Sequence, residues 1–575
     1  MYKFNSLISL HSFLIVSLIL TIAGCSKDSP TEPVDGPDPV IASVEPSFGT
    51  VGTEVRITGS YFREGAQVQF NDLNATEVDV ENGSIIFTFV PAGVDSGVTY
   101  DITVKNMDGT QIKFNEAFTV VGPDLMYVNS ATRPSGNNGS TVIIEGKSFG
   151  DKQGEGEVLF SDGSGGTISA TIASPDDWTD EFIITTVPND AETGDIRVKT
   201  ATGLSETLPF TVTETAAFSP SVINWTETTN LPVALSGHSA QFVPVAVDDN
   251  TINRFVYVLG GGDNSHDPQK EGYVAEIQQD GHIGSWNATT DLPVPRAFHA
   301  STAATPFNSR VSGDGYVYVI GGTNEDNEQP TTTVYKAPIN QDGSLGNWST
   351  TTPLPTATHS LGAVVFRGYV YIAGGATNDN TPVTSVHRAF IDSLGNLSEW
   401  ESMPSLPGSQ SYHSFSVFGG FLYAVAGESA AVSPNDGNYT NNDTKLRTVV
   451  YGRINLRNGL LSDTGWVINS EELSKRTSKH TALVAGGNIF VTAGLYSGAH
   501  TGSSENSYAS IRSDGSVGQF NGATGSNTIN SQGGGNLFNH AGLSYVDADG
   551  IARVMILGGD NVNNPGQKST AVWFY

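Results

Sequence analysis

The sequence predicts an all-β protein made of several domains, and three observations lead to this prediction. Short runs in which apolar and polar residues alternate are separated by Gly, Asn and Asp turn residues, the pattern of short strands. Glycine occurs 65 times, whereas helix-period patterns are almost absent. In the C-terminal part, a strand-like run rich in tyrosine and valine and ending in glycine recurs six times. A chain of 575 residues is also too long for one hydrophobic core.

The composition excludes two classes of partner. The formal net charge is -31 and only 15% of the residues are charged. Nucleic-acid binding requires Lys and Arg against phosphates, so this acidic chain is not expected to bind nucleic acid. The same charge opposes docking onto an anionic membrane surface. We interpret it as a soluble, self-repelling protein surface.

The first 24 residues have the features of a bacterial export signal. Lys3 precedes an apolar stretch, residues 13–22, that is too short to span a membrane. The four residues that end at Cys25, Ile-Ala-Gly-Cys, resemble the lipobox of bacterial lipoproteins. The resemblance implies cleavage before Cys25 and acylation of both its sulfur and the new amino terminus, which gives a stable membrane anchor. The alternative is an ordinary secretory signal with a chance cysteine.

The residues that follow Cys25 indicate the membrane in which the predicted lipoprotein is anchored. Ser26 stands where an aspartate would retain a lipoprotein of enteric bacteria in the inner membrane, so we expect the outer membrane. Lys27-Asp28 resembles the acidic tag of lipoproteins exported to the cell surface. Residues 25–38 are polar and contain several prolines, as expected of a semi-extended tether. Cys25 is the only cysteine, so the chain forms no internal disulfide.

Residues 39–121 show the strand pattern of an Ig-like β-sandwich. Ile41 to Pro46, Val55 to Gly59 with Phe62, Tyr100 to Val104 with Asn106, and Phe118 to Val120 together resemble a TIG (IPT) domain. Asp108-Gly109 is a hairpin-turn signal. In bacterial surface proteins such domains act as spacers, so we assign this one no chemistry.

Residues 122–214 repeat the same features. Val142 to Gly146, Val158 to Phe160, Ile196 to Val198 and Phe210 to Val212 follow the pattern of the first copy. This second segment therefore also resembles a TIG domain. Trp178 could form a ligand platform, but we assign it to the hydrophobic core.

Residues 215–575 contain six copies of one repeat. The strands that end in glycine are Phe255 to Gly261, Tyr316 to Gly322, Tyr369 to Gly375, Phe421 to Gly427, Ile489 to Gly494 and Val554 to Gly559. A tryptophan recurs in five copies, with a phenylalanine in the sixth: Trp225, Trp286, Trp348, Trp400, Trp466 and Phe520. A histidine also recurs, and Leu361 takes its place in one copy: His238, His299, His413, His480 and His540.

This combination resembles the kelch repeat, in which each unit is one four-stranded blade of a β-propeller. The resemblance implies a six-bladed kelch-type β-propeller in which the glycine pair ends the second strand and the tryptophan lies on the fourth. We expect the glycines and the repeated histidines to have a structural role, because a residue that recurs from blade to blade stabilises the blade fold, whereas a binding site breaks the symmetry. Trp225 precedes any first strand, so we expect residues 222–225 to supply the outer strand of the last blade and close the ring.

In kelch propellers the binding face is formed by the loops between second and third strands and by the loops between blades. In this chain those loops are rich in Asn, Asp, Thr and Ser, which hydrogen-bond sugar hydroxyls, and an aromatic ring can stack on a pyranose. The candidate ligand-binding residues are the aromatic and cationic residues of the two loop sets, Arg296, Phe298, Tyr412, Tyr439, Arg476, Tyr496, His500 and Phe538.

Three kinds of enzyme or metal site are alternatives to a binding role. Galactose oxidase also combines a kelch propeller with Ig-like modules, but its copper site requires a tyrosine–cysteine link, and here the only cysteine is the lipidation site. Kelch-type sugar mutarotases need arginine and carboxylate groups that converge on an anionic sugar, and a sequence does not show convergence. The histidines lack zinc-ligand spacing, and the Asp/Asn runs lack the spacing of a calcium loop. We therefore expect no cofactor, no metal and no catalytic residues.

The arrangement of anchor, tether, two spacers and a broad disc favours a binding protein on the cell exterior. We expect it to capture polysaccharide beside an outer-membrane uptake porin, which would be its partner. A scaffold that binds proteins or mediates adhesion is the alternative, because the fold by itself does not decide between them.

Overall fold

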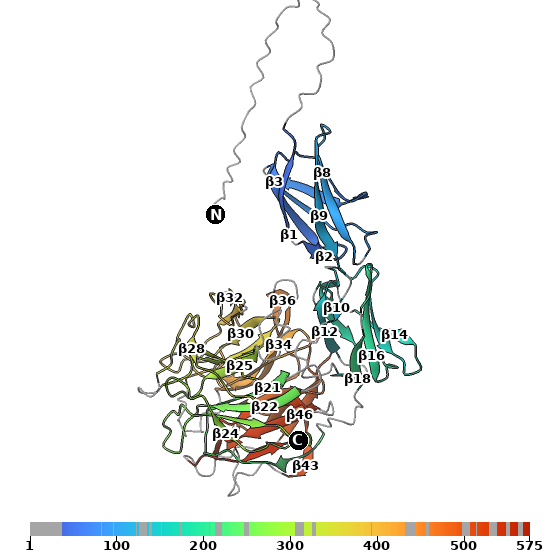
Figure 1. Cartoon of the computed structure of the whole chain (residues 1–575). Helices are drawn as coiled ribbons and strands as arrows, with labels where there is room; N and C mark the ends of the chain where they lie inside the picture. Colours follow the sequence, from blue (N-terminus) through green and yellow to red (C-terminus); the bar gives the residue numbers. More distant parts are fainter. Residues whose placement is uncertain are drawn as a thin grey trace, which may run out of the picture.

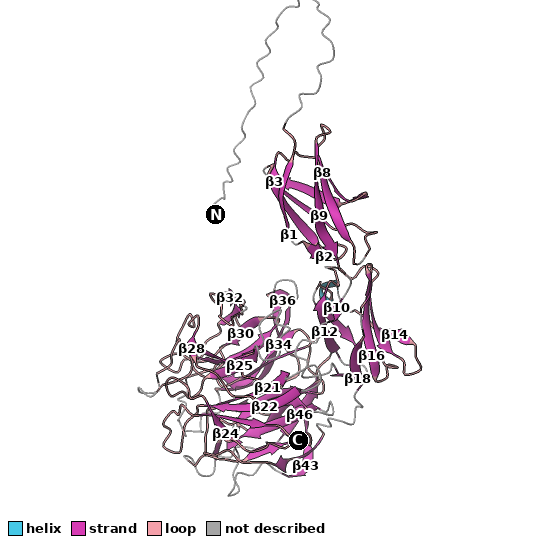
Figure 2. Cartoon of the chain, viewed as in Figure 1, coloured by secondary structure: helices cyan, strands magenta, loops and turns pink. Residues whose placement is uncertain are grey.

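The computed structural model consists almost entirely of strands and turns, which confirms the predicted all-β class (Figure 2). It describes residues 37–45, 47–81, 83–95, 97–121, 124–125, 135–136, 141–150, 152–172, 175–180, 182–205, 207–212, 221–246, 252–304, 315–324, 329–392, 394–431, 444–455, 459–496, 506–512, 514–527, 537–547, 552–561 and 567–575. The predicted signal, the lipidation site Cys25, most of the tether, and the candidate residues Tyr439 and His500 lie outside the described residues. No helix in the described part of the chain has the length and apolar character needed to cross a membrane.

The first domain is a sandwich of two antiparallel sheets with one parallel edge pair (Figure 1). One sheet has the order β1 (Val40–Glu45), β3 (Glu54–Ser60), β7 (Ile85–Phe89) and β6 (Thr76–Glu81). The other has the order β2 (Phe48–Gly49), β9 (Gln111–Val120), β8 (Thr99–Lys105), β4 (Gln67–Phe70) and β5 (Leu73–Asn74). Alternate residues of the two sheets face inward, and Phe70 meets Phe118 edge to face at 5.5 Å in this core.

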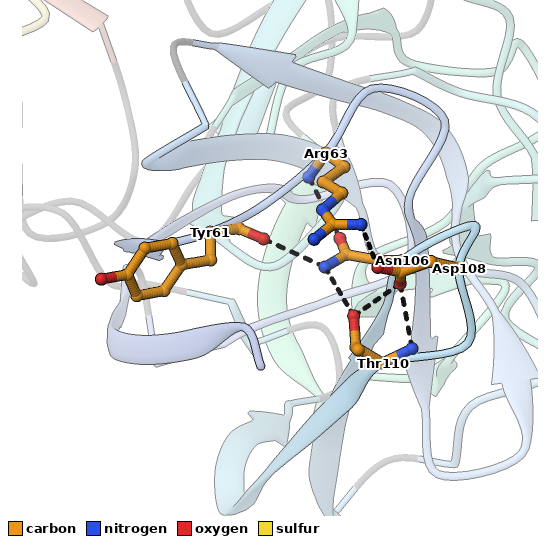
Figure 3. Close-up of polar contacts among 5 residues, drawn as sticks. All are labelled: Tyr61, Arg63, Asn106, Asp108 and Thr110. Carbon is orange, nitrogen blue, oxygen red and sulfur yellow. Dashed lines mark hydrogen bonds and ion pairs between the residues drawn. The ribbon is translucent and has the colours of Figure 1, made fainter. Parts of the chain in front are cut away.

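Polar contacts hold together the loops at one end of this domain (Figure 3). The Asn106 side chain donates to the carbonyl of Tyr61 and to Thr110 Oγ1, and it accepts from the backbone N–H of Arg63. Asp108 accepts from the hydroxyl and N–H of Thr110 and pairs with Arg63. These hydrogen bonds from Thr110 lower the pKa of Asp108. The predicted hairpin turn at Asp108 is confirmed, and the buried Asn106 has a structural role.

The second domain is a sandwich with nearly the same strand order. One sheet is β10 (Asp124–Leu125), β12 (Thr141–Lys147) and β15 (Phe182–Thr186). The other is β11 (Ser135–Gly136), β18 (Leu208–Val212), β16 (Gly194–Thr200), β13 (Glu157–Ser161) and β14 (Thr167–Ser169), with β17 (Gly203–Leu204) beside β16. A short 3-10 turn, η1 (Pro175–Asp177), precedes Trp178. The Trp178 indole is buried and donates to the carbonyl of Phe149 at 3.1 Å, so its assignment to the core is confirmed.

The rest of the chain forms six groups of four antiparallel strands in the described residues, and one of the short strand pairs extends the fourth group to a sheet of six strands. The first three are β21 (Ser239–Ala246), β22 (Ile252–Leu259), β23 (Gly272–Glu276) and β24 (Asn287–Thr289); β25 (Ala300–Ala304), β26 (Tyr316–Ile320), β27 (Val334–Pro338) and β28 (Ser349–Thr350); and β29 (Gly362–Phe366), β30 (Tyr369–Ala373), β31 (Val386–Phe390) and β32 (Glu401–Met403). The others are β33 (Ser414–Phe418), β34 (Phe421–Glu428), β35 (Lys445–Ile454) and β36 (Leu461–Ile468); β38 (Thr481–Ala485), β39 (Asn488–Thr492), β41 (Asn506–Ser510) and β42 (Asn521–Gly522); and β45 (Ala541–Val546), β46 (Ala552–Leu557), β48 (Val572–Phe574) and β20 (Thr226–Glu227). Three short pairs accompany them: β19 (Val222–Asn224) with β43 (Thr524–Asn527), β37 (Thr477–Ser478) with β40 (Leu495–Tyr496), and β44 (Leu537–Phe538) with β47 (Asp560–Asn561).

These six sheets are the blades of a propeller. The first strands β21, β25, β29, β33, β38 and β45 each contact the next, and β45 contacts β21 again, which closes the ring. The second strands are buried almost completely, because a blade packs between two neighbours. Such strands read as continuous apolar runs instead of an alternation, as in Val256 to Leu259.

Tyrosine hydroxyls join neighbouring blades. Tyr257 donates to the carbonyl of Gly343, which lies in the turn between the third and fourth strands of the next blade, at 2.7 Å. Tyr318, Tyr371 and Tyr423 make the same contact with the turns at Gly395, Gly459 and Gly515. Burial raises the pKa of each of these four tyrosines, so the hydroxyls remain protonated donors.

The chain closes the ring close to the predicted position, with one correction. The outer strand of the sixth blade is Thr226–Glu227, directly after Trp225, and it pairs antiparallel with β48. Residues 222–224, which were expected in that place, pair instead with β43 beside the fifth blade. The shift arises because Trp225 is buried against Phe490 of the fifth blade, which fixes the residues before it to that blade. In four blades the repeated tryptophan or phenylalanine likewise stands just before the fourth strand, and Trp466 lies within β36.

Candidate functional site

The two loop sets of the propeller lie on one face, which we call the loop face. In each blade the residue after the glycine pair bridges to the chain segment that enters the first strand. The six pairs are Ser236 with Gly262, Ala297 with Thr323, His359 with Ala376, Ser411 with Glu428, Ser478 with Leu495, and Phe538 with Asp560. The loops between second and third strands therefore adjoin the loops between blades, as the sequence predicts.

A closed ring of six backbone hydrogen bonds surrounds the propeller axis at this face. In each blade one residue donates its N–H to the carbonyl of the corresponding residue in the preceding blade, at 2.7 to 3.2 Å. The six residues, which we call the channel ring, are Gly237, Phe298, Ser360, Tyr412, Lys479 and Asn539. All six have positive φ, between 50° and 58°. This left-handed conformation directs each N–H and C=O along the ring. Five of the six residues are not glycine, and for a residue with a Cβ this backbone conformation is energetically unfavourable.

The side chains of the channel ring differ from blade to blade, and three of them gather into one group with two side chains from residues that precede ring members. The mouth cluster consists of Phe298, His359, Tyr412, Lys479 and Phe538. The Tyr412 ring meets Phe298 at 6.3 Å and His359 at 6.0 Å. The Lys479 ammonium lies over Tyr412 at 4.9 Å and over Phe538 at 5.8 Å, which are cation–π distances. Residues from five blade junctions thus form an aromatic group that includes one lysine.

His359 of the mouth cluster is neutral. Its Nε2 lies 3.0 Å from Asn380 Oδ1, and its Nδ1 lies 3.0 Å from Ser360 Oγ. Burial, with a smaller effect from the nearby Lys479 charge, lowers the pKa of His359 to about 4. The imidazole therefore serves as a hydrogen-bonding group and not as a cation near neutral pH.

The structure brings together three of the predicted candidates and separates the others. Phe298, Tyr412 and Phe538 belong to the mouth cluster, but Tyr412 and Phe538 are buried. Arg296 is also buried, 2% exposed, and its guanidinium lies 5.6 Å from the Tyr335 ring, so it is no surface contact for a ligand. Desolvation lowers the pKa of Arg296. These three buried residues come from three different loops, which enter the second, fourth and sixth blades.

Tyr496 and Arg476 lie farther out, between the fourth and fifth blades. A cavity of about 290 Å³, the rim cavity, opens there. Its walls are Leu473, Ser474, Lys475, Tyr496, Asn506, Ser507, Gly522 and Ala523. The Lys475 ammonium lies 5.3 Å from the centre of the Tyr496 ring. Arg476 is exposed next to the cavity and donates to the carbonyl of Lys445 at 2.9 Å.

The repeated histidines lie inside the blades. His238, His299, His413, His480 and His540 are 6 to 8% exposed, and each backs onto the second glycine of its own blade. Burial lowers their pKa values to about 3 for His299, His480 and His540 and to about 4 for His238 and His413. This placement agrees with the structural role assigned from the sequence. Across the described residues no group of three His, Cys, Asp or Glu side chains is arranged to hold a metal ion.

Sequence reasoning missed Lys479, His359 and two buried ion pairs. Glu428 pairs with Lys445 at 3.6 Å and accepts from Ser478 Oγ at 2.5 Å. Asp560, at the same blade position, pairs with Lys568. One signal could have found Lys479, Glu428 and Asp560: the positions just before the repeated histidine and just after the glycine pair carry a different residue in each blade. Symmetry-breaking positions are where a repeat protein can place a site.

Comparison with known proteins agrees with this architecture in part. The family model described as IPT/TIG domain matches residues 39–120, so the first sandwich is a TIG domain. Kelch-like protein 36 of Mus musculus is 25% identical over 191 residues, which is 33% of this chain and 27% of that protein. The Bos taurus protein of the same name is 24% identical over 188 residues, 32% of this chain and 27% of that protein. The match therefore spans about a quarter of the length of these relatives.

A solved structure described as "Structure of YjhT" aligns with 60% of this chain and 95% of its own chain, at 15% identity and a TM-score of 0.42. The strand topology and the similarity to kelch-like sequences identify residues 221–575 as a kelch-like propeller region.

Proposed function

We propose that this protein is a lipid-anchored binding protein of the bacterial cell surface that captures polysaccharide on the loop face of its propeller. The two sandwich domains serve as spacers between the anchor and the propeller. The second sandwich is a divergent TIG domain, since its strand order repeats that of the first.

The observation that carries the proposal is the position of the second sandwich on the propeller. Arg453 forms an ion pair with Asp177, and Gly420 lies against Ile184. Gly420 is in the turn before β34, and Arg453 is paired with Phe421 at the start of that strand. The loop face begins at Glu428, at the other end of the same strand, which is about 25 Å long at 3.3 Å per residue. The sandwich therefore occupies the opposite end of the fourth blade and leaves the loop face open to a large ligand.

The chemistry of the loop face favours a sugar polymer. Its loops carry Asn, Asp, Ser and Thr side chains, whose amides, carboxylates and hydroxyls match sugar hydroxyls. The rim cavity adds a partly exposed tyrosine beside two serines and an asparagine. Its volume of about 290 Å³ is close to the lower bound of about 300 Å³ for small-molecule sites, which suits one sugar unit of a chain.

Binding without turnover is part of the proposal. The most polar buried groups of the loop face, the pairs Glu428–Lys445 and Asp560–Lys568, are engaged with each other and hold loops in place. We propose that bound polysaccharide is passed to a neighbouring outer-membrane porin and is not cleaved or isomerised here.

The test is affinity electrophoresis of the full chain against a panel of plant and algal polysaccharides. We expect retardation by at least one glycan, and a loss of about 30-fold in affinity when an anchoring aromatic is truncated in Tyr496→Ala. Tyr61→Ala, an exposed tyrosine of the first domain, is the matched control and should change nothing. If no glycan retards the chain and a surface protein binds instead, the protein-binding alternative replaces this proposal, and release of a modified sugar would contradict the non-enzymatic role.

The anchor is tested separately. Cys25→Ser removes the only site of acylation. We expect the variant to leave the membrane fraction after a carbonate wash, while the unmodified chain stays, since acyl chains contribute about 0.8 kcal/mol per buried CH₂. Retention of the variant in the membrane would contradict the lipoprotein assignment.

A further inference from the structure

We infer that one end of the first sandwich is a contact site for the headgroup layer of the bilayer. This end, which we call the distal tip, consists of residues 38–40, 60–66 and 105–110 and lies away from the second sandwich (Figure 1). The inference rests on the lipid anchor of the proposed function and adds a second membrane contact to it. The anchored protein would then stand on the distal tip, with the propeller held away from the membrane.

The distal tip exposes large apolar side chains. Met107, in the turn between β8 and β9, is 81% exposed, and Tyr61, in the loop after β3, is 53% exposed. Val40, the first residue of β1, is 48% exposed. The loops are joined, because the Asn106 side chain donates to the Tyr61 carbonyl at 3.0 Å and Met107 lies against Gly65. Figure 3 shows the Tyr61 ring pointing away from these polar contacts, so it is available to a partner.

The backbone of Tyr61 is in an unfavourable conformation. Its φ is 63°, in the left-handed region, where a bulky side chain is an outlier. Glycine or asparagine adopts this conformation more easily. The exposed ring does not offset the unfavourable backbone by packing into the core of the domain. Backbone strain without a packing gain is expected where a side chain has a binding role.

The equivalent end of the second sandwich is covered by the first. Ser148, at the position of Tyr61, has φ of 60° and is buried. Gly150 stands at the position of Arg63, and a Cβ added to it would lie 3.4 Å from the carbonyl oxygen of Val51 in the first sandwich. Small residues permit this close contact between domains, whereas Tyr61 and Arg63 project from the distal tip. A soft layer that admits projecting side chains therefore fits the distal tip better than another rigid domain.

The start of β1 places the distal tip near the proposed anchor. Val40 pairs with Ser60, so the chain enters the first sandwich at this end. Cys25 precedes Val40 by 15 residues, which span at most about 50 Å when fully extended. An anchored chain thus keeps the distal tip at a high effective concentration beside the bilayer, where a weak contact becomes populated.

The side chains of the distal tip suit the membrane–water interface. Tyrosine is enriched there because its ring is apolar and its hydroxyl is polar, and methionine is a flexible apolar group. The charged groups of the distal tip have both signs, and Arg63 is paired with Asp108. The contact therefore depends on the apolar side chains and does not require an anionic membrane.

The test places a fluorescent dye in the distal tip of the full, lipid-anchored chain. Glu64→Cys introduces an exposed thiol, which is the only free one because acylation blocks the Cys25 sulfur. The labelled chain is reconstituted in vesicles of phosphatidylethanolamine and phosphatidylcholine, with and without nitroxide-bearing headgroups that quench the dye on contact. We expect quenching at position 64. Tyr61→Asn should lower the ratio of docked to undocked chain about tenfold, because a half-exposed tyrosine no longer enters the interface.

Two controls use the opposite end of the same sandwich. The dye at Asp72→Cys, in the exposed turn between β4 and β5, should not be quenched. Phe48→Asn, which removes an exposed aromatic ring at that end, should leave the quenching at position 64 unchanged. Asparagine tolerates the backbone conformation of residue 61, and near-ultraviolet circular dichroism checks that each variant is folded.

Flotation of the vesicles separates failure of the inference from failure of the anchor. If the chain floats but the dye at position 64 is not quenched, or if Tyr61→Asn changes nothing, the inference is wrong and the anchor stands. A spectral shift at position 64 that depends on protein density and not on the nitroxide would assign the distal tip to a second copy of the chain and would also overturn the inference. If the chain does not float, both the anchor and the inference fail.

Discussion

Glycine is required at one position of each blade for a local reason. The second residue of the glycine pair has φ between 88° and 108° in all six blades, a conformation that residues with a Cβ rarely adopt. The first residue has φ of only 51° to 62°, and in the fourth and fifth blades it is an alanine, Ala426 and Ala493. The repeat therefore tolerates a side chain at the first position and excludes it at the second.

Gly261→Ala should consequently destabilise the propeller by about 2–3 kcal/mol. Gly261 has φ of 103°, and an added Cβ would lie 2.6 Å from the Cβ of His238 and 3.0 Å from the carbonyl oxygen of Ser236. Urea unfolding followed by tryptophan fluorescence measures the change. Gly408→Ala is the control, because nothing lies within 4 Å of its added Cβ. Equal stability of the two variants would contradict the steric argument.

The buried histidines make stability depend on pH. Their folded pKa values of about 3 to 4 lie below the ordinary value of 6.5, so between these limits the unfolded chain binds more protons than the folded one. Stability is therefore fully present above pH 6.5 and falls as the pH drops toward 4. Each histidine contributes a slope of up to about 1.4 kcal/mol per pH unit inside that window.

His413→Leu tests this dependence at one site. Leu361 occupies the same position in the third blade, so the blade accommodates a leucine there. We expect near-normal stability at pH 7.5 and a shallower loss of unfolding free energy between pH 6.5 and 5, by up to about 1.4 kcal/mol per pH unit. The measurement is a series of urea titrations across that range. An unchanged slope would mean that His413 does not titrate on unfolding.

At the scale of elements, the closing strand is short but strongly held. β20 has two residues, yet it follows Trp225, which is buried against Phe490, and Ile223, which is buried with it. The segment therefore secures the edges of two blades at once: β20 extends the sixth blade, and β19 lies beside the fifth. Without it, the outer edge of the last blade would be unpaired.

Thermal melts of residues 221–575 and 230–575 measure this closure. Loss of a buried tryptophan alone costs about 3–5 kcal/mol, so we expect the shorter fragment to melt at least about 5 °C lower. A fragment of residues 37–575 that keeps all three domains provides the reference melting temperature. Equal midpoints for the two propeller fragments would show that the ring is held closed by the tyrosine and channel-ring contacts alone.

At the scale of the whole molecule, polar contacts among the described residues connect each domain to the next. Thr50 of the first sandwich shares a hydrogen bond of 2.8 Å with Thr202 of the second. Asp177 of the second sandwich, which is almost fully buried, pairs with Arg453 of the propeller. The first junction is a neutral contact, whereas the second places a carboxylate in a low-dielectric environment where it requires its partner.

Arg453→Gln should therefore loosen the second sandwich from the propeller without unfolding either. Removing the guanidinium leaves Asp177 buried without its ionic partner, and opening the junction hydrates that carboxylate. Small-angle scattering should show a larger radius of gyration for the variant than for the unchanged chain. Arg447→Gln, a surface arginine paired with Glu472 in the same blade, should leave the radius of gyration unchanged. An unchanged radius of gyration in Arg453→Gln would mean that apolar contacts such as Ile184 with Gly420 hold the junction.

The sequence by itself determined the strands, the two sandwich patterns, the six blades and the burial of Trp178. These features depend on residues that are close in the chain. The alternation of apolar and polar residues, the turn glycines and the repeated residue pattern can all be read from the sequence. The positions of Tyr412, Phe538 and Arg296 in loops were also predicted, although their burial was not.

Only the tertiary structure decided which of these loop residues meet. Lys479 reaches Tyr412 and Phe538 because the ring of six blades brings three separate chain segments to one axis. Lys475 and Tyr496 enclose a cavity because two loops, one before and one within the fifth blade, pair at Thr477. Such contacts depend on how the blades are arranged around the axis and on where a neighbouring domain docks. They join residues that are far apart in the chain, so the local order of residues does not reveal them.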